Sequence, residues 1–362
     1  MKTSGIIVEY NPFHNGHLHH IEEARRITDC DVLVAVCSGN YCQRGDVSIV
    51  DKFQKCEAAL EHGVDLVLEL PYIYTVQSAY IFASKAIEIL KMAKIDSLVF
   101  GSETNNLNEL KKYSELEVDV TRLKLLMHDG NSYPKAYGLL SGSLYPNDML
   151  AVAYLKALQG SNIVPISIQR TNDYHDQEMG VIASASAIRK ALEQGKDINQ
   201  ATSIEITDPI FNKDIYPHFR RLMFTMDRSD LEGIFMCDEG IENLFKDNAI
   251  RYADYEDFMK ASISRRYTRA RIQRIMLHIV NQIKKKDVSN LPPMDYARVL
   301  GFNEKGQSLL KELKKESNFI TQFKNIPEPY KDIEWKTSLF YSSLLDNGEE
   351  YLRKELKGPI VK

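Results

Sequence analysis

The chain has 362 residues, of which 44% are hydrophobic and 27% charged, and its net charge is −4. This balance is ordinary for a globular protein, and the length suggests two domains with a core each. The sequence shows no apolar run of about 20 residues and no cleavable leader. Its five cysteines form no disulfide framework. We therefore expect a cytoplasmic protein with reduced thiols and no membrane partner.

Short apolar runs alternate with helical patterns through the first half of the chain. The expected strands span residues 5–9, 31–36, 65–70, 97–101 and 163–168. The expected helices span residues 16–28, 52–62, 77–91 and 148–159. Strands that are apolar along their length and joined by helices predict a doubly wound parallel sheet, with Pro165 on an edge strand. Ligands bind at the carboxyl ends of the strands in such a sheet.

The second half of the chain shows helical periodicity and no convincing strand pattern after Gly195. The expected helices span residues 216–223, 231–235, 241–245, 272–283, 306–313 and 337–345. We therefore expect an α/β domain over residues 1–200, followed by a mainly α-helical domain over residues 201–362. Within the first domain, residues 105–145 interrupt the alternation, and we interpret them as a helical insertion that covers the site.

Positive charge is concentrated in one segment of the second half. Residues 258–286 contain nine Lys or Arg and neither Asp nor Glu, so this segment carries a charge of +9. Because the net charge is −4, the rest of the chain carries −13. An acidic body with one basic segment indicates a local site for a polyanion. A solvated helix face is the alternative explanation for this segment.

Four histidines lie within seven residues of the first strand–helix connection: His14, His17, His19 and His20. Spacings of three residues suit a zinc site, but the further ligands would be Cys37 and Cys42, whose spacing is unusual for zinc. Alternatively, His19 and His20 lie at the start of the helix and bind no ligand.

A phosphate site explains more of the same segment. Pro12 stiffens the turn after the first strand, and Asn15-Gly16 allows the backbone to approach a ligand at a helix N-terminus. His14 and His17 would then direct imidazole N–H groups toward an anion. The pattern H-x-G-H between a first strand and a first helix resembles that of the nucleotidylyltransferase superfamily, which has a Rossmann-like fold.

A second phosphate-type element follows at residues 182–189, with the sequence IASASAIR. Ser184 or Ser186 is suited to cap a helix whose N–H groups face an anion, and Arg189 can bind phosphate oxygens. This segment resembles the second motif of the same superfamily, although a plain helix cap would look the same. Two such elements in one α/β domain indicate ATP as the occupant.

The wider sequence resembles the bacterial tRNA(Met) cytidine acetate ligases from about residue 4 to residue 310. The motifs that carry the resemblance are, in order, VEYNPFHNGHLHH, SGNYCQRGD, FGSE, YPNDMLAVAYLKAL, YHD, RYTRARIQRIMLHI and VLGFNEKG. The resemblance implies that ATP activates acetate as acetyl-adenylate, and that the acetyl group passes to the wobble cytidine of elongator tRNA(Met) to give N4-acetylcytidine. It implies RNA and not DNA as the polymer that is bound.

The resemblance also implies an ATP site, with Mg²⁺ arriving on the nucleotide. His14 and His17 would be the catalytic residues that contact the reacting phosphate. Asp148 and Ala151 depart from the family pattern, in which we expect Asn and Gly. The residues implied to bind ATP are Ile7, Val8, Glu9, Tyr10, Asn11, Pro12, Phe13, His14, Asn15, Gly16, His17, Leu18, His19, His20, Gly101, Asn147 and Arg170, with Ser186 and Arg189 from the second motif.

The basic segment fits the second substrate of such an enzyme. As one continuous helix, it would spread its arginines around most of the helix circumference and make a broad surface for tRNA. Two other functions stay open: an adenylyltransferase that acts on a small phosphorylated metabolite, and a non-catalytic RNA-binding protein that retains a nucleotide-binding fold. The arginines of the proposed surface are Arg265, Arg266, Arg269, Arg271 and Arg274.

Overall fold

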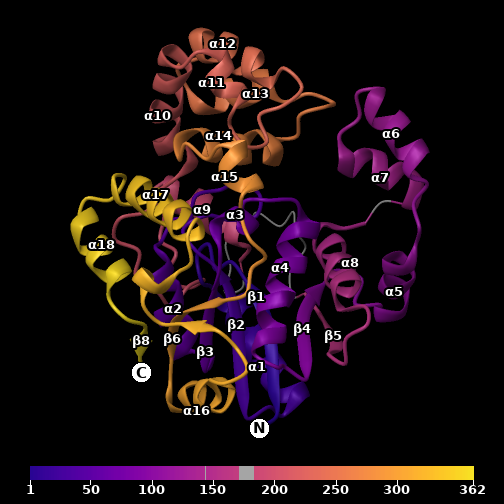
Figure 1. Ribbon diagram of the computed structural model, residues 1–362, viewed down its shortest axis with the longest axis vertical. Helices are drawn as coiled ribbons and strands as arrows, with labels where there is room; N and C mark the ends of the chain where they lie inside the picture. The colour runs from indigo at the N-terminus through magenta and orange to yellow at the C-terminus, as the bar shows by residue number, and fades with distance from the viewer. Residues whose placement is uncertain (143, 171–182) are drawn as a thin grey trace.

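The computed structural model describes residues 1–142, 144–170 and 183–362. Its centre is an eight-stranded sheet in the order β5-β4-β1-β2-β3-β6-β7, with β8 beside β6 (Figure 1). Every strand pair is parallel except β3 with β6. The strands are β1 (Thr3–Val8), β2 (Val32–Ser38), β3 (Leu66–Leu70), β4 (Ser97–Ser102), β5 (Val164–Gln169), β6 (Ala297–Phe302), β7 (Phe319–Ile320) and β8 (Ile360–Val361).

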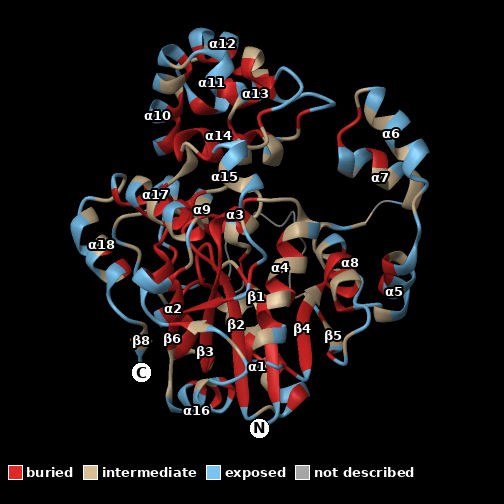
Figure 2. Ribbon diagram, in the orientation of Figure 1, coloured by how far each residue is buried: buried red, intermediate tan, exposed pale blue. Residues whose placement is uncertain are grey.

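The first five strands are those that the apolar runs predict, and Pro165 lies on β5 at the sheet edge as expected. All residues of β2 and β3 are buried, because helices cover both faces of the sheet (Figure 2). These helices are also confirmed, with ends that shift by one or two residues. They are α1 (Asn15–Thr28), α2 (Lys52–Glu61), α4 (Ala79–Met92) and α8 (Pro146–Leu158). A short helix that was not predicted, α3 (Tyr72–Thr75), follows β3.

The insertion forms three helices, α5 (Leu107–Glu115), α6 (Val120–His128) and α7 (Tyr133–Ser141). Helix α5 packs along α8, whereas α6 and α7 form an arm that projects from the sheet and is largely exposed (Figures 1 and 2). None of the described residues in the insertion lines the cavity at the carboxyl ends of the strands, and the expectation that the insertion covers the site stays a prediction.

A group of helices stands beyond the carboxyl ends of the parallel strands (Figure 1). The predicted helices of this region are present, and the aromatic side chains of Phe219, Phe245 and Phe258 form its core. Its members are α10 (Asn212–Thr225), α11 (Arg228–Glu232), α12 (Ile241–Arg251), α13 (Tyr255–Ser262), α14 (Arg269–Val280) and α15 (Lys285–Ser289). Helix α9 (Ala185–Glu193) precedes it, close to the sheet.

The chain then returns to the first sheet, so the expectation of no strand after Gly195 is wrong. Strand β6 pairs antiparallel with β3, and it escaped detection because Arg298 interrupts its apolar run. Helices α16 (Glu304–Leu313), α17 (Tyr330–Ser342) and α18 (Gly348–Leu356), with the short 3₁₀ helix Phe323–Asn325, pack around this added edge. A domain division near residue 200 stays a prediction. No helix in the described ranges is long and apolar enough to span a bilayer.

Candidate active site

A cavity of about 300 Å³ opens at the carboxyl ends of β1, β2, β4 and β5, where the fold predicts a ligand. Helix N-termini of α1 and α9 also face it. Most residues that were expected to bind ATP line this cavity. They are Ile7, Val8, Glu9, Tyr10, Asn11, His14, Gly16, His17, His19, His20, Gly101, Asn147, Arg170, Ser186 and Arg189.

Four residues from the same expected set do not line the cavity. Phe13 is fully buried against Tyr10, with ring centroids 5.0 Å apart. Asn15 points away, because its Nδ2 donates to the carbonyl oxygen of Gln200 at 2.9 Å. Pro12 belongs to the turn after β1, and Leu18 packs against the core beneath this turn. These residues shape the H-x-G-H turn and do not face the ligand space.

His14 is both the N-cap of α1 and a wall of the cavity. Its Nδ1 accepts a hydrogen bond from the Gly16 backbone N–H at 3.0 Å, so Nε2 carries the proton of the neutral ring. Burial, followed by the charges of Arg170 and Arg189, lowers the pKa of His14 to about 4. The ring is therefore neutral near pH 7, with Nε2–H available as a donor.

His17 lies against His14, with ring centroids 3.8 Å apart. Burial is the main cause that lowers the pKa of His17 well below its ordinary value, and the nearby His14 adds to it. Its Nδ1 is buried and has no hydrogen-bond partner among the described residues. Buried polar atoms are nearly always paired, so a further partner for this nitrogen is expected. His14 and His17 thus place two imidazole rings side by side in the cavity wall.

His20 does more than decorate the start of the helix. A ring nitrogen lies 3.2 Å from the carbonyl oxygen of Val99 in β4, which ties α1 to the sheet. Burial lowers its pKa to about 4. His19 also lines the cavity, and ligand binding by these two histidines stays a prediction.

Two arginines approach the histidine pair from different elements. Arg189 on α9 donates from Nη1 to the carbonyl oxygen of Asn11 at 2.7 Å, which holds it against the H-x-G-H turn. Arg170 follows β5, and burial is the main cause that lowers its pKa. Its Nε is buried and has no partner within the described ranges. Cations held in this way are suited to the oxygens of a polyphosphate.

The second motif places a helix N-terminus at the same cavity. Ser184 caps α9, and its Oγ accepts from the Ala187 N–H at 3.1 Å. Ser186, the second residue of α9, lines the cavity. The expected arrangement of cap, serine and Arg189 is therefore present. Ile182 of this motif and the YHD segment at residues 174–176 lie outside the described residues.

Gly101 and Asn147 stand at the end of β4 and the start of α8. A Cβ on Gly101 would meet Arg170 Cγ at 3.3 Å, so glycine leaves room for the arginine to cross the strand end. The Glu103 carboxylate accepts from the backbone N–H groups of Asn147 and Asp148, at 3.1 and 3.0 Å. Glu103 therefore fixes the N-terminus of α8 beside the cavity.

The two departures from the family pattern lie behind the cavity wall. Asp148 is fully buried, and its Oδ1 accepts from Ser102 Oγ at 2.5 Å and from the Glu103 N–H at 3.0 Å. Ala151 is also fully buried. Neither residue lines the cavity. Asp148 therefore supports the turn after β4 from behind the cavity wall.

The segment SGNYCQRGD at residues 38–46 closes one side of the site. Glu9 Oε1 accepts from the Gln43 N–H at 2.6 Å, and burial raises the pKa of this carboxyl. Gly45 has φ +85°, and a Cβ there would lie 2.4 Å from the backbone nitrogen of Arg274 on α14. The glycine thus lets this loop pack directly on α14, which links the cavity to the helical region.

Sequence reasoning missed the apolar wall of the cavity. Phe82, Phe100, Leu150 and Tyr154 line it from α4, β4 and α8. An apolar wall beside polar anchors is usual for the site of a small molecule. In the sequence these residues look like ordinary core positions, and only the topology brings them together.

The zinc alternative is not supported by the thiols near the histidines. Burial raises the pKa of Cys37 to about 12 and raises that of Cys42 further. Both thiols are therefore protonated without a metal, and a zinc ion would have to displace these protons to bind the thiolates. Within the described residues, no group of three or more His, Cys, Asp or Glu side chains is arranged to hold a metal ion.

The basic segment differs in detail from the expected continuous helix. Thr268 caps α14, whose first residue is Arg269, so Arg265 and Arg266 lie in the preceding turn. Arg269 and Arg271 form ion pairs on the surface with Glu256 and Glu239.

Arg274 does not belong to an exposed surface. Its guanidinium donates to the carbonyl oxygens of Gln77 and Ala270, and burial lowers its pKa to about 10. Gln77 O also accepts from Gln43 Nε2 at 2.7 Å. Arg274 therefore connects α14 to the loop that lines the cavity.

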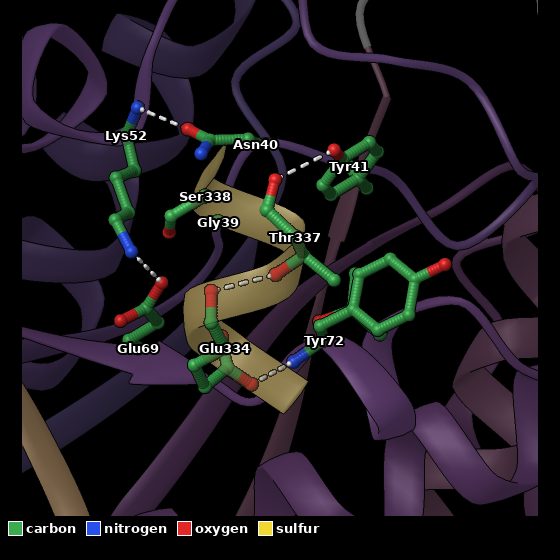
Figure 3. A pocket seen from close by; sticks show the side chains of 10 residues that line it. Gly39, Asn40, Tyr41, Lys52, Glu69, Tyr72, Glu334, Thr337 and Ser338 are labelled. Carbon is green, nitrogen blue, oxygen red and sulfur yellow. Dashed lines mark hydrogen bonds and ion pairs between the residues drawn. The ribbon is translucent and has the colours of Figure 1, made fainter. Parts of the chain in front are cut away.

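A second, much smaller cavity of about 10 Å³ lies where the carboxyl ends of β2 and β3 meet α17 (Figure 3). Lys52 Nζ contacts Glu69 Oε1 at 2.8 Å and Glu355 Oε1 at 2.9 Å, and Arg298 Nη1 pairs with both carboxylates at 2.9 Å. This buried network joins the C-terminal segment to the sheet. The cavity has room for about one water molecule, which is too little for a substrate. We therefore assign the ion-pair network a structural role.

Glu334 on α17 faces the same small cavity, and the pH dependence of stability should reveal it. Burial raises its pKa to about 8, while its Oε1 accepts from the Tyr72 N–H at 2.7 Å. A carboxyl whose pKa rises on folding binds its proton more tightly in the folded state. Stability is therefore lost as the pH rises from about 4.5 to about 8.

We expect Glu334→Gln to remove that loss, because the amide keeps the acceptor for Tyr72 and carries no charge. The melting temperature of the variant relative to the wild type should be higher at pH 9 than at pH 5.5. Differential scanning calorimetry at the two pH values measures it. The same difference at both pH values would contradict a neutral Glu334 in the folded protein.

The fold and the site define the chain as a nucleotidyl transferase: the model of the HIGH Nucleotidyl Transferase family matches residues 1–355. Curated relatives narrow the class. The tRNA(Met) cytidine acetate ligase of Limosilactobacillus reuteri is 38% identical over 343 residues, covering 87% of this chain and 88% of the relative. That of Oceanobacillus iheyensis is 35% identical and covers both chains completely. The chain therefore belongs to the tRNA(Met) cytidine acetate ligase family.

Solved structures agree with this assignment. Thermotoga maritima TmcAL without ligand is 29% identical and superposes with a TM-score of 0.89, covering 100% of this chain and 99% of the other. The same protein bound with alpha-thio ATP is also 29% identical and gives a TM-score of 0.87 with the same coverage.

Proposed function

We propose that this chain uses ATP to activate acetate and transfers the acetyl group to the wobble cytidine of elongator tRNA(Met), forming N4-acetylcytidine. The observation that carries the proposal is the close His14–His17 pair in the cavity, which Arg170 and Arg189 also line. The whole-chain similarity to tRNA(Met) cytidine acetate ligases supports the choice of substrates. Cytoplasm, where ATP and tRNA meet, is the proposed location.

In the first step, an acetate oxygen attacks the α-phosphorus of ATP and pyrophosphate leaves. Carboxylate is already charged at neutral pH, so no protein nucleophile is needed. Catalysis then rests on positioning and on stabilising the charge that grows on the phosphate oxygens. His14 Nε2–H and the ring of His17 would donate to oxygens around the α-phosphorus. Arg189 and the N-terminus of α9 would hold the pyrophosphate end.

In the second step, the cytidine amino nitrogen attacks the acetyl carbonyl of acetyl-adenylate. The C–O bond to AMP breaks, and the amino group loses a proton. The cytidine must leave its stack to reach the cavity, which is easiest in a single-stranded anticodon loop. Mg²⁺ would arrive with ATP: Glu9 is held by Gln43, and Asp46 accepts from Asn212 and Gln273, so neither is arranged as a dedicated ligand.

Exchange of labelled pyrophosphate into ATP tests the first step without RNA. We expect exchange that depends on acetate, because acetyl-adenylate formation is reversible on the enzyme. A panel of small carboxylates and phosphorylated metabolites serves as the comparison. Exchange supported by a phosphorylated metabolite and not by acetate would favour the small-molecule adenylyltransferase, and no exchange with any compound would favour the non-catalytic RNA-binding protein.

A further inference from the structure

Exposed tyrosines gather where the α6–α7 arm approaches the body of the protein. Tyr133 and Tyr137 lie one turn apart on α7, with ring centroids 5.9 Å apart and planes inclined by 27°, which is a stacked arrangement. Tyr133 is 53% exposed, and Tyr80 at the start of α4 is 56% exposed. Large aromatic rings that remain in water are unusual and mark a surface that binds something.

The three tyrosines form one cluster, although they come from two elements. Partial burial raises the pKa of the Tyr133 phenol, and the phenols of Tyr137 and Tyr80 raise it further by proximity. Lys156 of α8 lies over the Tyr137 ring at 5.5 Å from its centroid, and its Nζ contacts the Tyr137 hydroxyl at 3.3 Å. The cluster therefore combines two exposed tyrosines, Tyr80 and Tyr133, with the half-buried Tyr137 and a cation.

The position of this tyrosine cluster connects two sites described above. Tyr80 lies in the first turn of α4, and Phe82 on another side of this helix lines the catalytic cavity. On the other side, the Ser132 N–H donates to the carbonyl oxygen of Arg265 at 3.1 Å, and Arg265 Nε donates to Asn131 Oδ1 at 2.8 Å. The cluster thus lies between the cavity and the basic segment.

The charge of the arm favours an anionic partner. Residues 120–145 contain Arg122, Lys124 and Lys135 against Asp129, a net charge of +2 in a chain whose net charge is −4. Exposed leucines on the same arm would suit a protein partner, but stacked tyrosines beside cations are the combination that binds single-stranded nucleic acid. Ring faces hold the bases while the cations hold the phosphates.

We propose that Tyr80, Tyr133 and Tyr137 form a stacking platform for unpaired bases of the RNA loop that carries the target cytidine. The platform would hold neighbouring bases outside the cavity while the cytidine enters it. This inference rests on the proposed function for the identity of the RNA. Base stacking is tolerant of sequence, so the platform supplies affinity and register more than base identity.

Binding of a synthetic anticodon stem-loop RNA to the full chain tests the platform. We expect Tyr133→Ala to weaken binding about 5- to 100-fold, whereas Tyr133→Phe, which keeps the ring, stays close to the wild type. Because the tyrosine makes no phosphate contact, the dependence of affinity on salt should not change in the alanine variant. A stem-loop whose loop nucleotides lack bases should bind the wild type and Tyr133→Ala equally.

The outcomes separate this inference from the proposed function. Loss of affinity that is the same for the abasic loop would overturn stacking, as would equal affinity of all three proteins for the intact loop. A change of sedimentation in Tyr133→Ala without any change in RNA binding would assign the surface to a second copy of the chain and also overturn it. Acetate-dependent pyrophosphate exchange, measured without RNA, reports on the proposed function alone.

Discussion

Replacement of His14 by alanine should lower the rate of acetyl-adenylate formation by about 10²–10³-fold, the usual cost of losing one donor to a developing charge. Nε2–H of His14 is the donor, because Nδ1 is already committed to the Gly16 N–H. His17→Ala should have an effect of the same order, since its ring lies against His14 in the cavity wall. Acetate-dependent pyrophosphate exchange measures both.

His14 also caps a helix, so a second variant must separate its two roles. Asparagine is a good N-cap and can accept from the Gly16 N–H, but it places no donor where Nε2 stands. We expect His14→Asn to keep the melting temperature of the wild type and to remain impaired in exchange. His218→Ala, a change at an exposed position on α10, serves as the matched control.

The pH dependence supplies an independent check on the role of His14. Its pKa is lowered to about 4, so the ring stays neutral, with its donor in place, at every pH well above that value. Exchange should therefore show no loss from this group between pH 8 and pH 5.5. A rate that falls with a midpoint near 6.5 and loses that midpoint in His14→Asn would contradict the neutral donor.

The parallel sheet could be predicted because its strands are apolar on both faces and alternate with capped helices. Strand β6 could not be predicted, because Arg298 breaks its apolar pattern. The charge of Arg298 is neutralised by Glu69 and Glu355, which come from distant parts of the chain. The pairing of β6 with β3 is likewise a long-range contact that no local signal encodes. Buried charges that find partners only in the tertiary fold are the reason that this edge was missed.

The polar half of the site was predictable, since His14, His17, Ser186 and Arg189 belong to motifs with a local mechanism. The apolar half was not, because Phe82 and Tyr154 are ordinary core residues until α4 and α8 are placed beside the strand ends. Arg274 was predicted to bind tRNA because it belongs to a basic run in the sequence. Its guanidinium instead donates hydrogen bonds to two backbone carbonyl oxygens.

Reversal of charge in the exposed part of the basic segment should weaken tRNA binding and reduce its dependence on salt. Arg266 precedes α14 and Arg269 begins it, so both face outward from the helical region. In Arg266→Glu/Arg269→Glu, the slope of log affinity against log salt should fall by about one unit for each phosphate contact that is lost. Filter binding of tRNA(Met) across a salt series measures this slope.

A control variant with the same change in net charge is needed, because any more acidic protein repels tRNA more strongly. It separates the loss of a local contact from this general repulsion. Lys314 and Lys315 are both exposed at the end of α16, beyond the amino ends of the parallel strands and far from α14 (Figure 1). Lys314→Glu/Lys315→Glu changes the net charge by the same amount and should leave the slope unchanged. If both double variants lose affinity equally, the segment acts only through net charge.

Acetyl-adenylate formation must be measured in the same arginine variants, because α14 also packs on the loop that lines the cavity. Helix α14 contacts that loop through Gly45 and Arg274. Neither residue is substituted in Arg266→Glu/Arg269→Glu. Exchange without RNA should therefore stay within about twofold of the wild type. Loss of exchange together with loss of tRNA binding would mean that these arginines hold α14 in place, and the tRNA surface would then have to lie elsewhere.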